Sequence, residues 1–154
     1  MNLWAPVAEL RAEESSASFR LFKTRFTEIA YSDDQALSDF LWRISGKRLS
    51  AKDDLTPAKS RLDEIVERVQ TVLDMHPENF QLKVRLYPKY TEGRIASYKP
   101  ATRTIMVFAD RVTDGVFAHE VAHAVLCDYF GTAPSEKVQE ILSQYVDRNL
   151  WEDY

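Results

Sequence analysis

The sequence predicts a single α+β domain spanning residues 1–154, in which helices, a small sheet and two further helices follow one another. Three observations favour it. Apolar residues at helical spacing dominate residues 32–75, alternating apolar residues recur between 81 and 109, and helical spacing returns from 114 onward. With 45% hydrophobic and 29% charged residues and four glycines, the chain is expected to bury a core without disulfides.

The first 31 residues divide into a leader and a candidate strand. Residues 1–18 are polar and are expected to precede the folded part. Strand-forming residues favour a strand over residues 25–31, although three phenylalanines between residues 19 and 26 also fit a helical stripe. The strand is our preferred interpretation.

Two helices are predicted next. Ser32 and Gln35 match a capping box, which predicts a helix that ends at Gly46. Thr56-Pro57 predicts the start of a second helix, since proline suits the first helical position, and His76-Pro77 predicts its end. The expected buried residues of the two helices are Leu37, Phe40, Leu41, Ile44, Leu62, Ile65, Val66, Val69, Val72 and Leu73.

Three strands and two helices complete the expected domain. The strands are predicted over residues 81–87, 94–98 and 104–109, because apolar residues alternate there between turn residues. The next helix is expected to begin after Thr113 or Asp114 and to close on Gly131. Pro134 or Ser135 is expected to open the last helix, which runs to about residue 150.

The first of these two helices carries His119-Glu120-Val121-Ala122-His123, an H-E-x-x-H motif. Residues four apart lie on one helix face, so both imidazoles can bind one metal ion. Glu120 points about 100° around the helix, where it can contact a metal-bound water rather than the metal. The alternative is a core helix with incidental histidines. The surrounding residues are almost wholly apolar, so a metal would satisfy polar groups that are otherwise costly to bury.

A third metal ligand is expected from the last helix, because zinc sites normally supply three protein ligands and leave the fourth position for water. Glu140 is preferred, since it lies a full turn inside the helix and beside the small Ser143. Glu136, in the first turn, is the runner-up. Asp128 is rotated off the histidine face, and Cys127 is interpreted as a buried thiol rather than a ligand.

The motif followed by Glu140-Ile141-Leu142-Ser143-Gln144-Tyr145 resembles the gluzincin zinc metallopeptidases, closest to their small peptidase-MA-like members. The strand order before the motif is similar as well. The resemblance implies a minimal zincin fold, with Zn²⁺ on His119, His123 and Glu140 and with Glu120 as the base in peptide-bond hydrolysis. The chain departs from the family at Gln144, where thermolysin-type members carry an aspartate that orients a zinc-bound histidine. Asp147 or a backbone carbonyl is expected to take this role.

Two further parts of an active site are expected. The family suggests Tyr145 as an oxyanion donor, whereas its place in an apolar arc with Val138, Ile141, Leu142 and Val146 favours packing. The predicted last strand is expected to lie at the sheet edge and to bind an extended substrate, the alternative being an edge strand without a ligand. Its residues are Thr104, Ile105, Met106, Val107, Phe108 and Ala109.

The resemblance implies a peptide or protein substrate, and the composition argues against a nucleic-acid partner and a membrane span. A net charge of −4 argues against a nucleic-acid surface. No apolar run is long enough to span a membrane, and the N-terminus does not resemble a signal peptide, so a soluble protein is expected, cytoplasmic unless an export signal was removed. The alternatives to a general peptidase are a catalytically weak or inactive zincin scaffold that binds metal or a partner, and a regulatory protease with one partner.

Overall fold

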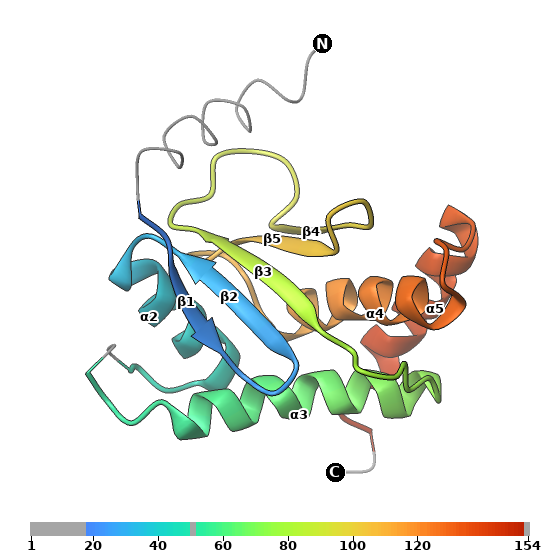
Figure 1. The fold of residues 1–154 in the computed structure, drawn as a ribbon, viewed down its shortest axis with the longest axis horizontal. Helices are drawn as coiled ribbons and strands as arrows, with labels where there is room; N and C mark the ends of the chain where they lie inside the picture. Colours follow the sequence, from blue (N-terminus) through green and yellow to red (C-terminus); the bar gives the residue numbers. More distant parts are fainter. Residues whose placement is uncertain (1–17, 50–51, 153–154) are drawn as a thin grey trace.

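In the computed structural model, residues 18–49 and 52–152 are described, and they form a five-stranded mixed sheet with four helices, as expected for an α+β fold (Figure 1). The predicted leader lies outside the described residues except for Ser18. In chain order the elements are β1 Arg20–Lys23, β2 Thr27–Tyr31, α2 Asp34–Ser45, α3 Thr56–Leu73, β3 Leu82–Tyr87, β4 Ala96–Lys99, β5 Thr104–Phe108, α4 Asp114–Phe130 and α5 Glu136–Asn149.

The strand order is β1-β2-β3-β5-β4, with parallel pairs in the centre and an antiparallel pair at each edge. The expectation that residues 104–109 form an edge strand is therefore wrong. β5 lies between β3 and β4, and β4 is the edge because the chain turns back so that Ala96 pairs with Val107. Alternating hydrophobicity reveals a strand but does not determine which strands become its neighbours.

The N-terminal strand prediction was too long at its start. β2 begins at Thr27, and β1, which the sequence left ambiguous, pairs with it as a hairpin. The turn between them is closed by the Thr24 backbone N–H, which donates to the Thr27 carbonyl over 2.9 Å. Residues 25 and 26 belong to this turn, so the aromatic and β-branched residues around them do not form one continuous strand.

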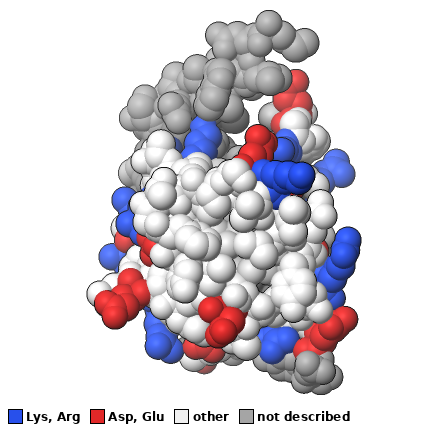
Figure 2. Space-filling model, turned by 90° about the vertical axis from the view of Figure 1, so that its right-hand side faces the viewer, with Lys and Arg blue, Asp and Glu red and all other residues white. Residues whose placement is uncertain are grey.

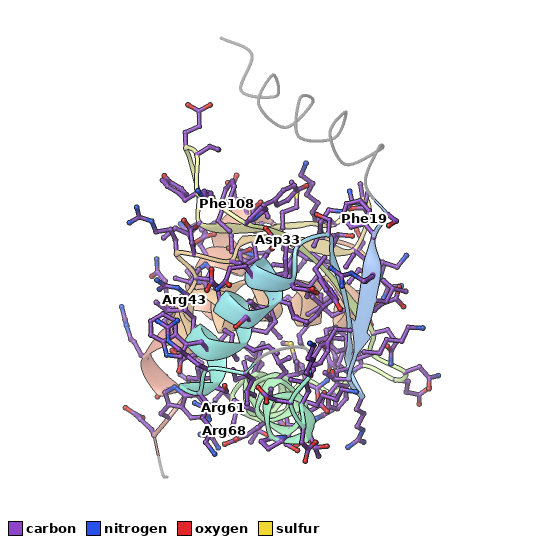
Figure 3. All side chains as sticks on the ribbon, turned by 90° about the vertical axis from the view of Figure 1, so that its left-hand side faces the viewer. Phe19, Asp33, Arg43, Arg61, Arg68 and Phe108 are labelled. Atoms are coloured by element: carbon purple, nitrogen blue, oxygen red, sulfur yellow. The ribbon has the colours of Figure 1, made fainter. Side chains whose placement is uncertain are left out.

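The start of α2 is also displaced from the prediction. Asp33, not Ser32, is the N-cap: its backbone is extended and its Oδ1 accepts from the Gln35 N–H over 2.8 Å (Figure 3). The Gln35 side chain donates to Asp39 instead of returning to the cap, so the expected capping box does not form. The predicted end is confirmed, since Gly46 adopts a left-handed conformation with φ 76°.

The helices lie on one face of the sheet (Figure 1). α4 is the central helix: it contacts β4 and β5 of the sheet, and it also packs against α3 and α5. α4 is buried around most of its circumference, including Phe117, Val121 and Val125, which are each 0% exposed. This burial explains why its sequence is apolar on nearly every face. Of the described helices, none is both long and apolar enough to cross a lipid bilayer.

α5 packs with a face that the sequence predicted only in part. Its buried residues are Ser143 and Val146, and Val146 belongs to the predicted apolar arc, whereas Val138, Ile141 and Tyr145 of the same arc are 42%, 55% and 50% exposed. The end of α5 is instead tied to α3. Arg68, labelled in Figure 3, donates through Nε to the Leu150 carbonyl over 3.0 Å and through a terminal nitrogen to the Glu152 carbonyl over 2.9 Å.

The displaced cap of α2 gives a direct test of the fold. We expect Asp33→Ala to lower the free energy of unfolding by about 1 kcal/mol, because it removes the acceptor of a helix N-cap. Ser32→Ala is the matched control and should change it little, since Ser32 is exposed and outside the cap. Urea unfolding of the three proteins would measure both effects, and a larger loss in Ser32→Ala would contradict the assignment.

Candidate metal centre

The two motif histidines and Glu120 are placed by α4, whose ends are both capped. The Thr113 hydroxyl accepts from the Val116 N–H at the start, and Gly131 closes the helix with φ 71°. His119 and His123 lie one turn apart on the face toward α5, with ring centroids 5.1 Å apart. Their side chains are 23% and 11% exposed, so both reach solvent from a mostly buried helix.

Glu140 of α5 completes a group of three side chains that could hold a metal ion. Its two carboxylate oxygens lie 3.9 Å from His119 Nε2 and 3.4 Å from His123 Nε2. Among the described residues, this is the group whose ligand atoms all lie within 4.8 Å of one another. Glu140, the preferred third residue, therefore meets both histidines, and Glu136 remains exposed in the first turn of α5.

His119 is oriented by Asp147, one of the two groups that were expected to take this role. The two carboxylate oxygens lie 2.9 and 3.2 Å from His119 Nδ1. An ionised carboxylate can only accept, so the proton must be on Nδ1, which leaves the Nε2 lone pair of a neutral ring facing Glu140. Asp147 can do this because it is two helical turns after Glu140 and therefore on the same face of α5.

His123 is oriented by Gln139, a residue that the sequence did not single out. Gln139 Nε2 donates to the Pro134 carbonyl over 2.8 Å, which turns Oε1 toward His123 Nδ1 at 2.9 Å. Because the carbonyl can only accept, the orientation of the amide is determined, and Nδ1 of His123 is again the donor. The one signal in the sequence is a glutamine one position before Glu140, and a glutamine is most simply interpreted as solvent-exposed.

Two imidazole nitrogens and one carboxylate oxygen are a typical ligand set of catalytic zinc sites, which leave the fourth coordination position open for water. Tetrahedral zinc with ligand bonds of about 2.0–2.1 Å separates its ligand atoms by roughly 3.4 Å. The spacings of 3.4 and 3.9 Å from Glu140 to the two Nε2 atoms come within a few tenths of an ångström of this value. The residues present could therefore hold a metal ion, with His119, His123 and Glu140 as its ligands, and their chemistry is compatible with zinc.

Glu120 lies beside the three residues rather than among them. It is 5% exposed, and its Oε2 accepts from the Tyr98 backbone N–H of β4 over 2.8 Å. Burial raises the pKa of this carboxyl group, against the opposing effects of His123, the Tyr98 amide, His119 and Arg94. A carboxyl group that is held in place and shifted toward a higher pKa is suited to exchanging protons near neutral pH.

A cleft of about 660 Å³ opens over this centre. One wall is the start of β4 with the loop before it, a second is the first turn of α4, and a third is α5 with the residues that follow it. The residues that line the cleft include Arg94, Ala96, Asp114, Glu120, Glu140 and Asp147. The cleft therefore joins two of the three candidate ligands, His119 and Glu140, with the candidate base and the start of β4, whereas His123 is not among its lining residues.

The other residues that the sequence considered lie elsewhere. Tyr145 is not among the cleft-lining residues and lies on the exposed side of α5, so the expected oxyanion donor is not at the site. Gln144 is exposed, Asp128 forms an ion pair with Arg103, and Cys127 lies 4.0 Å from Gln139 Oε1. Burial raises the pKa of the Cys127 thiol, which disfavours the thiolate that a metal would require.

Comparison of the chain with protein-family models, with curated protein sequences and with solved structures finds no match in any of the three.

The two acceptors on α5 should control metal affinity. We expect Asp147→Ala and Gln139→Ala each to weaken zinc binding about 10- to 100-fold, because each releases a histidine from its orienting hydrogen bond. Gln144→Ala, on the exposed side of the same helix, is the matched control and should bind like the wild type. Competition with a chromophoric chelator measures the three affinities, and equal values would contradict the assigned roles.

The buried carboxyl group of Glu120 should make the stability of the metal-free protein depend on pH. Its folded-state pKa is raised, so the folded state binds the proton more tightly than the unfolded state. Stability is then lost as the pH rises from the ordinary value of a glutamate through the raised one. Glu120→Gln lacks this loss, and its stability relative to the wild type should increase between pH 4 and pH 8. If the free energies of unfolding of the two chelator-treated proteins changed in parallel with pH, this expectation would be contradicted.

Proposed function

We propose that this protein is a zinc-dependent metallopeptidase that hydrolyses peptide bonds. The observation that carries the proposal is the orientation of the two histidines. Each Nδ1–H donates a hydrogen bond to an acceptor on α5, so that both Nε2 atoms face the Glu140 carboxylate, which lines an open cleft. A closed structural site would be expected to supply a fourth protein ligand, and it would have no need of Glu120.

The ion would supply Lewis acidity, lowering the pKa of a bound water to about 7. The Glu120 carboxylate is placed to accept the proton of the attacking water and to return it to the amine that leaves. The Tyr98 amide holds Oε2 of this carboxylate, so Oε1 is the oxygen left to exchange the proton. Asp147 and Gln139 keep both rings in the tautomer that the site needs throughout.

The edge of β4 supports an extended peptide substrate. The Tyr98 N–H points away from β5 toward Glu120, whereas the Ile95 carbonyl accepts from the Phe108 N–H of β5. Backbone groups alternate along an antiparallel strand, so Ala96 directs its own to the same side as Tyr98, toward the cleft that it lines. A peptide added along this edge gains main-chain hydrogen bonds with little sequence preference, and β4 takes the role first expected of residues 104–109.

A second candidate is a metal-dependent binding or regulatory protein that does not cleave its partner. The exposed apolar arc of α5 favours it, since exposed apolar patches often mark interaction sites. Figure 2 looks onto this side of the molecule, where charged residues are sparse near the centre. The arc lies on the opposite side of α5 from Glu140 and Asp147, so a partner bound there would leave the cleft open.

Turnover by the zinc-loaded protein separates the two candidates. We expect the wild type to hydrolyse casein or a peptide library and Glu120→Gln to lose at least about 100-fold in rate while retaining its zinc. Equal activity in the two proteins would contradict the peptidase proposal.

Metal analysis tests the ligands independently of turnover. His123→Ala and Glu140→Gln are expected to lose stoichiometric zinc, whereas Glu136→Gln should keep it, because that glutamate is exposed and does not belong to the group of three candidate ligands. Stoichiometric zinc in His123→Ala would contradict this ligand set.

A further inference from the structure

Arg94 is the cation among the described residues that line the cleft. It is exposed and lies two residues before β4, on the wall that also presents Ala96. The cleft otherwise carries the carboxylates of Asp114, Glu120, Glu140 and Asp147. A positive side chain that faces the substrate space needs an explanation, and the following inference rests on the proposed peptidase function.

The carboxylates of the cleft have closer partners than Arg94. Asp114 lies 3.6 Å from a terminal nitrogen of Arg61, and Asp147 holds His119. Glu140 faces both histidines, and Glu120 accepts from the Tyr98 amide.

The other described arginines have partners of their own, with one exception. Every one except Arg94 and Arg148 makes an ion pair, a hydrogen bond to a backbone carbonyl or a contact with an aromatic ring. Arg148 lies on the exposed surface of α5, outside the cleft lining. Arg94 therefore lines the cleft and forms no ion pair with another described residue.

We propose that Arg94 binds a carboxylate of the peptide substrate, so that the protein prefers peptides that carry such a group close to the cleaved bond. The planar guanidinium matches a carboxylate with two parallel hydrogen bonds, which gives both attraction and orientation. The carboxylate is either the free C-terminus of the peptide or the side chain of an aspartate or glutamate. These two sources differ in whether the protein trims peptide ends or cuts within acidic segments.

The alternative role for Arg94 is to stabilise the oxyanion at the reacting carbonyl. Among the described residues Arg94 forms no ion pair with a carboxylate of the cleft, and it lies just before β4, next to the strand edge along which a peptide would bind. This position suits a group on a substrate residue beside the cleaved bond. An oxyanion donor would instead have to reach within about 3 Å of the carbonyl oxygen.

Peptide binding to zinc-loaded Glu120→Gln tests the inference without requiring turnover. The probes are two matched pairs of N-acetylated hexapeptides. The members of the first pair differ only in whether the C-terminus is free or amidated. Both members of the second pair are amidated, and they differ in carrying an internal glutamate or glutamine. In at least one pair we expect the carboxylate peptide to bind about tenfold more tightly at low salt. Adding Arg94→Gln should abolish the difference and leave the neutral peptides unchanged, whereas Arg94→Lys should keep part of it. Arg148→Gln, the matched control, should have no effect.

Two results would overturn the inference. One is no preference for the carboxylate in either pair, including the case in which no hexapeptide binds. The other is an equal loss of affinity for neutral and acidic peptides in Arg94→Gln, which would indicate that Arg94 has a general structural role. Failure of the peptidase proposal would look different: the wild type would cleave no peptide, yet the preference dependent on Arg94 would persist in the binding measurement.

Discussion

The hydrogen bonds from the two histidines of α4 to acceptors on α5 are the interactions on which the rest of the site depends. A neutral imidazole offers one donor and one acceptor, and an isolated side chain can choose either nitrogen. Asp147 and Gln139 remove that choice by accepting from Nδ1, and Gln139 is itself oriented by the Pro134 carbonyl. The position of α5 thereby decides whether two helical histidines become a pair of metal ligands.

The two helices also pack against each other beside the site. Ser143 is 0% exposed, and its small size suits a close approach of α5, while Val146 is an apolar residue that α5 buries. The Ser143 hydroxyl has no hydrogen-bond partner among the described residues, so this contact favours close approach over polar complementarity. Metal binding would connect the helices through ligands from both, and its free energy would then stabilise the docked position of α5.

The sheet contributes to the same site from the opposite wall. β4 directs the Tyr98 amide toward Glu120, so the edge strand positions the candidate base and, in the proposed function, would also bind the substrate. The buried carboxyl group is costly in the metal-free protein, as its raised pKa indicates. The helices and the sheet therefore concentrate polar groups in one cleft that a metal ion and a substrate would satisfy.

Local patterns determined much of this protein. The motif helix with its caps, the helices α2 and α3, the strands β3, β4 and β5 and the preference for Glu140 follow from periodicity, end signals and helical geometry, whereas Asp147 was expected from the family resemblance, with a backbone carbonyl as the alternative. Tertiary contacts decided the rest. The strand order made β4 the edge, and α5 docked through Ser143 and Val146 while Val138, Ile141 and Tyr145 of its apolar arc stayed exposed. Gln139 met His123, and Arg94 met a cleft formed by parts that are distant in the chain. Periodicity describes a single element, whereas these outcomes depend on which faces of distant elements meet, and no local pattern encodes that.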